Sequence, residues 1–214
     1  MRWMIATALL AALSASGCKS AYYGTLETFG KHKRDLLVER VEEARDDQQE
    51  AKESFQTALE RFSALTGFEG GELQKAYSTL SKEYERCAGE AEDVEQRIGS
   101  VEEVAGDLFD EWETELDQYS DAKMRRASEQ QMKDTRDRYQ DLIGAMRRAE
   151  SKMEPVLAAF HDRVLFLKHN LNAQAIASLR GEVGTLEKDV ARLVGEMDAA
   201  IREANEFIES MPRS

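Results

Sequence analysis

The sequence predicts an all-α protein that folds as an elongated antiparallel helical bundle, or coiled coil, of about four long helices. The 214 residues include 2 prolines and 13 glycines, and 33% are charged, a composition that favours long uninterrupted helices. Apolar residues recur at alternating spacings of four and three, which is the pattern of a coiled-coil seam. Short breaker stretches interrupt this pattern at three places, and they divide it into four helices.

The first 17 residues are predicted to be a signal peptide. Arg2 supplies a short positive region, and an apolar stretch of about ten residues follows over 4–13, too short to cross a bilayer as a helix. Small residues at 14–17 then lead to Cys18. The sequence therefore predicts that the chain is exported.

Cys18 is the predicted lipidation site. Small residues before a cysteine resemble the bacterial lipobox, in which lipid is added to the thiol and the chain is cut just before it. The match departs at Ala15, where lipobox proteins usually have leucine. An ordinary secretory cut after Gly17 is the alternative. By the same resemblance, Lys19 implies sorting to the outer membrane, so we expect a periplasm-facing protein of the cell envelope, held to the membrane by an acyl anchor.

Each later segment follows from the apolar pattern and its interruptions. Residues 18–32 are expected to form a lipid-anchored tether that is partly helical, and residues 33–214 to form the bundle. The seams predict helices over 33–65, 72–119, 122–170 and 173–211.

Three residues within or beside these predicted helices carry a specific expectation. Gln48 is the one polar residue in the first seam, where it is expected to fix the register. Pro155 lies inside the third helix and should kink it or start a new segment. Asn172 is a predicted N-cap of the last helix.

The charge distribution limits the classes of partner. A formal net charge of −13 argues against nucleic acid, because phosphate binding needs clustered cations. Twelve acids and one base, Arg97, lie between Glu90 and Asp117, whereas the start of the third helix is basic from Lys123 to Arg148. A turn near Ser120 would place these stretches side by side and set their register.

A second basic cluster lies next to the predicted tether and has two interpretations. It would contact anionic headgroups if it lies at the membrane, with aromatic rings at the interface. The alternative, which we favour, is a charge match inside the bundle near Glu102, Glu103 and Asp107. The candidate membrane-proximal contacts are Tyr22, Tyr23, Lys31, Lys33 and Arg34.

No residue pattern indicates catalysis, a metal site or a cofactor. The three histidines, His32, His161 and His169, are not preceded by the glutamate that a di-iron bundle needs three residues earlier. Cys87 occupies a seam position and is expected to pack as a small apolar residue, with nearby acids raising its pKa. We therefore expect no catalytic residue, no metal ligand and no cofactor, and a protein that is not an enzyme.

Several stretches resemble a bacterial lipoprotein family catalogued as domain of unknown function 2959. The resemblance spans nearly the whole chain after Cys18, and it implies an exported, coiled-coil-rich protein of Gram-negative type. It implies no activity, ligand or catalytic residue. The stretches are CKSAYYG at 18–24, KHKRD at 31–35, MRRAE at 146–150, MEPVL at 153–157 and LKHNLNA at 167–173.

Three functional hypotheses follow from these observations. The first is a non-enzymatic envelope lipoprotein whose coiled-coil surface serves protein interaction or structural support, with another envelope protein as partner. The second is a bundle that binds an anionic membrane surface, and the third is a bundle that binds a metal or ligand. Seams this regular also allow association with a second copy of the chain.

Overall fold

The protein is an all-α helical bundle, as the sequence predicts. The computed structural model describes residues 33–67 and 73–211. The predicted signal peptide over 1–17, the lipidation site Cys18 and the tether over 18–32 lie outside the described residues. The helices are α2 (Lys33–Thr66), α3 (Leu73–Leu116), α4 (Ala122–His169), α5 (Ala173–Arg180) and α6 (Val183–Ser210).

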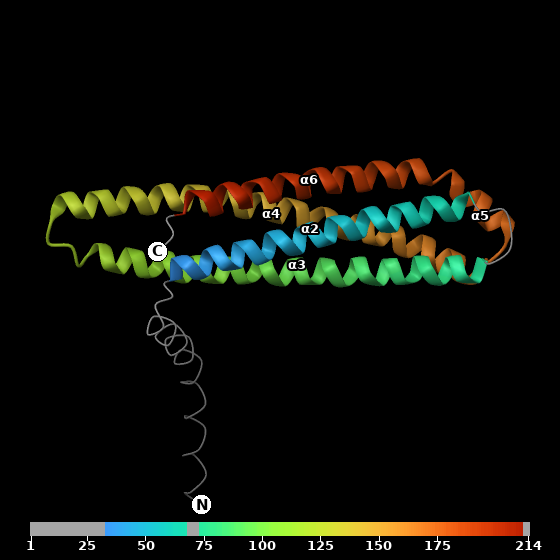
Figure 1. Cartoon of the computed structure of the whole chain (residues 1–214), viewed down its shortest axis with the longest axis horizontal. Helices are drawn as coiled ribbons and strands as arrows, with labels where there is room; N and C mark the ends of the chain where they lie inside the picture. The colour runs from blue at the N-terminus through green and yellow to red at the C-terminus, as the bar shows by residue number, and fades with distance from the viewer. Residues whose placement is uncertain (1–32, 68–72, 212–214) are drawn as a thin grey trace, which may run out of the picture.

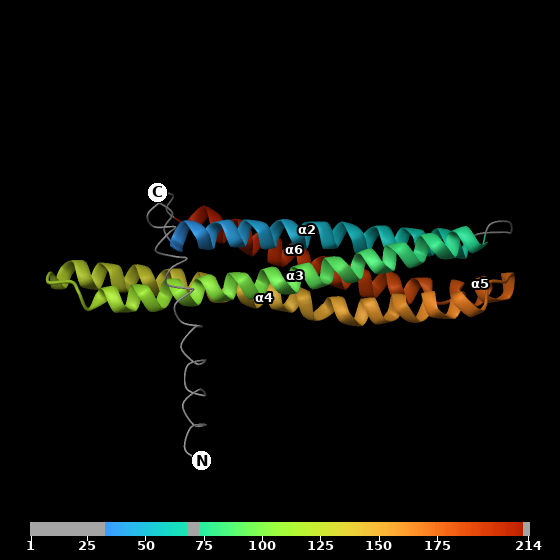
Figure 2. The same ribbon diagram turned by 90° about the horizontal axis from the view of Figure 1, so that it is seen from below.

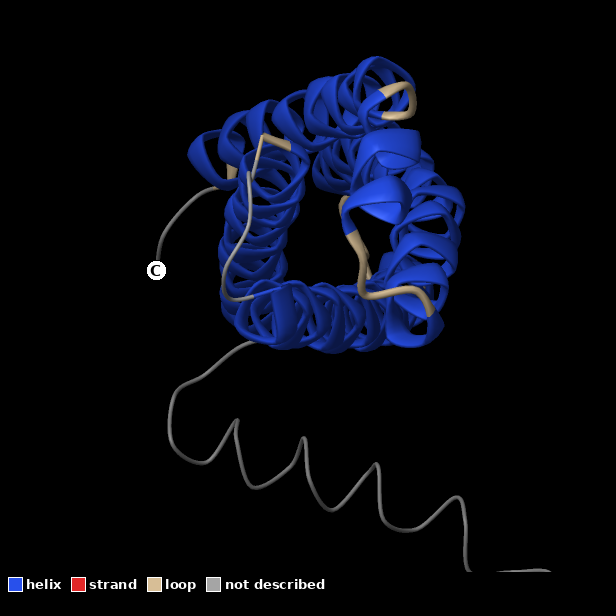
Figure 3. Cartoon of the chain, turned by 90° about the vertical axis from the view of Figure 1, so that its right-hand side faces the viewer, coloured by secondary structure: helices blue, strands red, loops and turns tan. Residues whose placement is uncertain are grey.

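Four long helices lie side by side and alternate in direction (Figures 1 and 2). Helix α2 packs against α3 and α6, and α4 packs against the same two helices. The four helices therefore form a closed ring in the order α2, α3, α4, α6, which is visible when the bundle is viewed along its axis (Figure 3). Because α4 has 48 residues and each residue of a helix rises 1.5 Å, the molecule is a rod about 70 Å long.

The predicted seams form the core. Their side chains are buried along the rod, which is the result expected when a 4-3 spacing keeps facing the same neighbours. Polar Gln48 is buried among them, with no exposed surface. The largest fully buried side chains are Phe55, Phe62, Phe160, Phe207, Leu37, Leu80, Ile98, Leu142, Met146, Met153, Leu167 and Leu186.

Ion pairs join α3 to α4, whose opposed charge stretches were predicted to lie side by side. Acids of α3, and Asp117 just after it, meet bases of α4 on the outer side of the pair. Asp121 caps the first turn of α4 by accepting from the backbone amides of Lys123 and Met124. The pairs are Asp117–Arg125 at 3.0 Å, Glu113–Arg136 at 2.7 Å and Glu102–Arg147 at 2.5 Å. The opposed charge stretches thus lie on neighbouring helices.

Helix α4 does not restart at Pro155, in contrast to one of the two outcomes that the sequence predicts. It runs without interruption from Ala122 to His169 with Pro155 inside it. Proline removes the amide that would donate to the carbonyl four residues earlier, here that of Ser151. Both residues are exposed, so water can hydrate that carbonyl and the helix continues.

The predicted last helix over 173–211 is two helices. Asn172 caps α5 as predicted, because its side-chain oxygen accepts from the amide of Ala175 at 3.0 Å. The break at Gly181 and Glu182 is a single turn in which the Glu182 amide donates to Leu179 O at 3.0 Å. The apolar spacing did not reveal it, because both residues keep right-handed helical angles and the seam stays in phase.

The α3–α4 hairpin extends beyond the other two long helices. At that end, α2 begins at Lys33 and α6 stops at Ser210, while α3 and α4 continue to their turn (Figures 1 and 2). Lys33 lies beside Glu111 of α3, with Lys33 Nζ 2.9 Å from Glu111 Oε2. The residues of α3 and α4 from about Glu111 to Gln131 are therefore a two-helix projection from a four-helix body.

Candidate interaction sites

A groove lies where α2 begins against the projecting hairpin, and we call it the hairpin groove. It has a volume of about 660 Å³ and combines apolar and charged side chains from three helices. Because its residues repeat at helical spacings on α3 and α4, the groove continues the inner face of the bundle beyond the start of α2. Its lining residues are Lys33, Arg34, Leu108, Glu111, Trp112, Glu115, Tyr119, Met124, Ala127, Ser128 and Gln131.

Two of the predicted membrane-proximal residues hold α2 against α3 at this groove. Lys33 pairs with Glu111, and its ammonium also lies 3.4 Å from the backbone oxygen of Asp107. The guanidinium of Arg34 lies over the ring of Trp112, 5.3 Å from its centre. Both side chains therefore contact α3 inside the bundle, as in the favoured alternative. Their partners Glu111 and Trp112 lie about one helical turn beyond Asp107, the last of the expected acids. Tyr22, Tyr23 and Lys31 lie outside the described residues.

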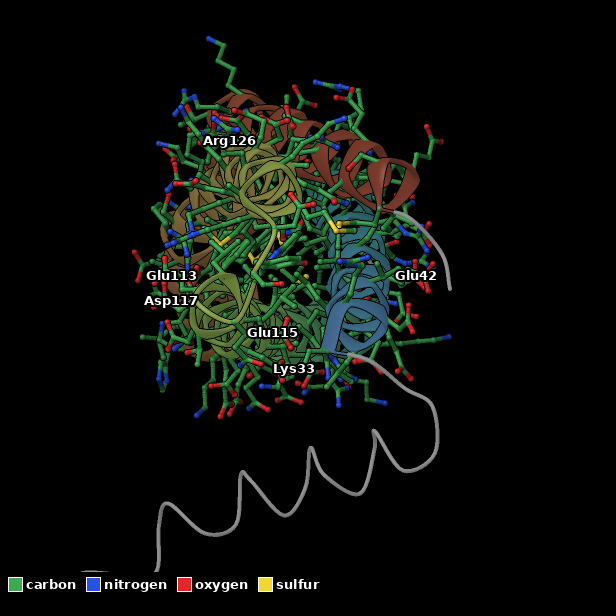
Figure 4. The ribbon with its side chains drawn as sticks, turned by 90° about the vertical axis from the view of Figure 1, so that its left-hand side faces the viewer. Lys33, Glu42, Glu113, Glu115, Asp117 and Arg126 are labelled. Atoms are coloured by element: carbon green, nitrogen blue, oxygen red, sulfur yellow. The ribbon has the colours of Figure 1, made fainter. Side chains whose placement is uncertain are left out.

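The floor of the hairpin groove is held together by a polar contact between its two long helices. Trp112 Nε1 donates to Ser128 Oγ at 2.8 Å. Figure 4 looks onto this end of the rod: Lys33 and Glu115 lie on the side where α2 begins, and Glu113 and Asp117 lie on the outer flank of the hairpin. Towards the tip, Tyr119 is 42% exposed and Met124 62% exposed. The groove is therefore ordered at its floor and open at its tip.

The α4 side of this groove was not predicted from the apolar spacing. The apolar spacing of the third predicted helix starts at Met132, whereas the groove is lined by the preceding residues Met124, Ala127 and Gln131. The 3-4 spacing of these residues is a signal, but a weak one, because Gln131 is polar and Ala127 small.

A second, acidic groove lies between α3 and α4 in the middle of the rod. It has a volume of about 420 Å³. Tyr84 and His161 meet across it with ring centres 5.3 Å apart. Its other lining residues are a set of small and apolar side chains below a rim of carboxylates: Ala88, Ala91, Met153, Leu157, Ala158, Glu92, Glu95, Glu150 and Glu154.

Comparison with known families places the whole bundle in one family. A family model described as "Protein of unknown function (DUF2959)" matches residues 22–211. The chain belongs to this family. No curated protein and no solved structure matches the chain.

The far end of the DUF2959 rod exposes two adjacent large apolar side chains. Leu165 is 45% exposed and Phe166 40% exposed on the last turns of α4, at the end that carries α5. The flanking residues Val164 and Leu167 are buried, so the helix turns its seam inward and leaves this pair outside. These two residues could not be predicted as a site from the apolar spacing, because the predicted seam passes through Val164 and Leu167 beside them.

Cys87 lies in the apolar core of the DUF2959 bundle. Cys87 has no exposed surface, and burial, followed by the charges of Glu83 and Glu90, raises the pKa of its thiol to about 12 against the lowering effect of Arg86. Among residues 33–67 and 73–211, no three His, Cys, Asp or Glu side chains are grouped to hold a metal. Within the same residues, no helix is both long and apolar enough to span a bilayer.

Proposed function

We propose that this DUF2959 protein is a non-enzymatic lipoprotein of the cell envelope that presents its helical rod to another envelope protein. In this proposal the chain is cut before Cys18, an acyl lipid on Cys18 holds it to the outer membrane, and the bundle faces the periplasm. The leader over 1–17 and the small residues before Cys18 support the anchor.

The observation that carries the interaction is the exposed pair Leu165 and Phe166. Helix α2 has 34 residues, so the end of the rod that carries this pair lies about 50 Å from Lys33, where the chain enters the bundle. Adjacent exposed apolar side chains in an otherwise charged surface are the kind of anchor that protein interfaces use. A rod tethered at one end and apolar at the other is suited to reaching a partner away from the membrane.

Site-specific photocrosslinking in living cells tests the interaction. A photoreactive residue in place of Phe166 is expected to form an adduct with one defined envelope protein, identified by mass spectrometry. The matched control places the same residue at exposed Lys188 of α6, where no adduct is expected. Substituting Leu165→Asp in the Phe166 crosslinking chain should abolish the adduct while circular dichroism remains unchanged. No adduct from position 166, or one that L165D leaves intact, would refute the proposed interaction.

A labelling experiment tests the anchor independently. Cells given a radiolabelled fatty acid should label the wild-type chain and not a Cys18→Ser chain. A labelled C18S chain, or an unlabelled wild type, would refute lipidation at Cys18 without bearing on the apolar pair.

A further inference from the structure

We propose that the hairpin groove is a docking site for the chain's own residues 22–32, which follow the proposed anchor and precede α2. Tyr22, Leu26 and Phe29 would cover the inner face of the projecting hairpin. This contact completes the bundle at that end. It depends neither on a partner at the far end nor on lipid at Cys18.

The groove is the position of a helix that the described residues do not supply. Along the body of the rod, α3 and α4 are covered on their inner side by α2 and α6. Beyond Trp112, which Arg34 of α2 covers, the same face continues to Tyr119 after α3 and Met124 of α4, and no described helix covers these two residues. A face that alternates buried and open positions at the bundle's own spacing fits a helical segment better than an irregular loop.

The length of the preceding segment matches the length of the groove. Residues 22–32 number eleven, and as a helix they would extend about 16 Å beyond Lys33. The uncovered part of α4 runs from Ala122 to Gln131, ten residues that rise about 15 Å. A continuation of α2 along its own axis would therefore end near the hairpin tip.

The apolar spacing of the segment continues the inward face of α2. Leu36 is buried and the side chain of Lys33 lines the groove. Stepping back from these two positions by alternating intervals of four and three residues reaches Phe29, Leu26 and Tyr22. These three residues would occupy one face of a helix, the face that Lys33 turns to the groove.

The extent of the family supports the same conclusion. The DUF2959 model matches from residue 22, eleven residues before α2 begins. The sequence pattern of the family therefore includes this segment together with the helices, as expected if it belongs to the folded module.

A cysteine pair in the full chain tests the contact. Phe29→Cys with Ala127→Cys joins the proposed docking face of Tyr22, Leu26 and Phe29 to the groove wall. We expect a disulfide within one chain under mild oxidation, identified by mass spectrometry of the linked peptide. Lys31→Cys with Ala127→Cys is the matched control, because residue 31 lies on the opposite side of a helix from residue 29, and it should link at least about tenfold less. The single Ala127→Cys chain accounts for links to Cys18 or Cys87.

The oxidation of Met124 gives a second readout that does not depend on added cysteines. Residues 22–32 would shield its exposed side chain, so in the wild type Met124 should react slowly with peroxide. Leu26→Arg together with Phe29→Arg should raise the oxidation rate of Met124 at least about threefold. Thr28→Arg lies outside the proposed docking face and should not change this rate.

Three results would overturn the proposal. A disulfide between two chains would assign the groove to a second copy. Equal linking from positions 29 and 31 would show that the segment does not lie in the groove with the proposed face. Equal Met124 oxidation in all variants, with helix content unchanged, would show that the segment leaves the groove open.

Discussion

Gln48 is a buried amide in an apolar seam. It has no exposed surface, and neither Nε2 nor Oε1 has a hydrogen-bond partner among the described residues. The neighbouring seam positions on α2, Ala44 and Ala51, are small. A buried polar group without a partner costs free energy, and such residues are tolerated where they disfavour other registers or oligomeric states.

We predict that Gln48→Leu raises the free energy of unfolding by about 1–2 kcal/mol, because it replaces an unpartnered amide by an apolar group of similar volume. Urea denaturation followed by circular dichroism measures the change. Gln49→Leu is the control: Gln49 is half-buried and donates to Glu53 at 2.7 Å, so its substitution should not stabilise the protein. A loss of stability in Q48L would mean that the amide is hydrogen-bonded in solution.

Cys87 should be inert in the folded protein. Its pKa is raised from 9.0 to about 12, chiefly by burial, so the reactive thiolate is suppressed at neutral pH. In a Cys18→Ser chain, where Cys87 is the sole thiol, we expect a disulfide reagent to react only after denaturant is added. Complete labelling of the native protein within minutes at pH 8 would contradict this assignment.

The same thiol makes stability depend on alkaline pH. The folded-state pKa lies above the unfolded value, so the folded chain holds a proton that the unfolded chain releases above about pH 9. Burial of the protonated Cys87 thiol therefore contributes fully to the free energy of unfolding below pH 9, and this contribution is lost as the pH rises towards 12.

At the residue scale, buried positions could be predicted where neighbouring helices cover a repeating apolar pattern, and not where those neighbouring helices end. The seams predicted the buried positions of Phe55, Ile98 and Leu186, because burial follows directly from spacing. Tyr119 also lies on a predicted seam but is 42% exposed, because the helices that would cover it stop short of the hairpin tip. Exposure at an end depends on where neighbouring helices stop, which spacing does not encode.

At the scale of the element, α4 stays helical although Pro155 removes one of its backbone hydrogen bonds. Helix α4 buries residues on both sides of the proline, including Met153, Val156 and Phe160. This packing holds the backbone helical although one hydrogen bond is missing.

We predict that Pro155→Ala stabilises the protein by about 1–3 kcal/mol, because alanine restores the amide donor and has the highest helix propensity. Thermal unfolding of the variant is the measurement. Glu154→Ala, at the adjacent exposed position, should change stability little. An unchanged or lower melting temperature in P155A would indicate that α4 uses the bend that proline imposes.

The break between α5 and α6 marks the limit of prediction at this scale. The contacts that fix it come from other helices: Arg180 Nε donates to Thr66 O at 2.6 Å, and Arg163 pairs with Glu182 at 3.0 Å. Both are long-range contacts that no local pattern contains. The cap at Asn172 was predictable because capping is a property of a few consecutive residues.

At the scale of the whole molecule, the rod shape rests on α4. It spans the hairpin end and the α5 end as one helix (Figure 1). We predict a distance of about 68 Å between spin labels on Lys123→Cys and Lys168→Cys, since 45 residues separate them along one helix. Pulsed electron paramagnetic resonance of a Cys18→Ser chain gives this distance, and buried Cys87 should take no label. A distribution centred well below it would mean that the two halves of α4 fold against each other.

The four-helix class and the α3–α4 pairing were predictable from the sequence, whereas the interaction surfaces were only partly so. Lys33 and Arg34 were identified from their charge. Opposed charges predicted that Lys33 pairs with an acid of α3, although one helical turn from the expected place, and they did not predict the contact of Arg34 with the ring of Trp112. The hairpin groove was not identified, because it arises from the unequal lengths of α2, α3 and α4. Cys18, Tyr22, Tyr23 and Lys31 remain predictions.

The first and last long helices of the described chain are direct neighbours. Lys52 of α2 pairs with Asp198 of α6 at 3.0 Å, and Arg45 donates to Asn205 at 3.1 Å. Such contacts between remote parts of a chain form late, because a long loop must close first. Helix α6 is also the last helix of the described chain, so α2 lacks one of its two neighbours until residues 183–210 have packed against it. A chain truncated before residue 183 would therefore expose the apolar side of α2 that α6 covers, and such a fragment should be digested by protease much faster than the complete bundle.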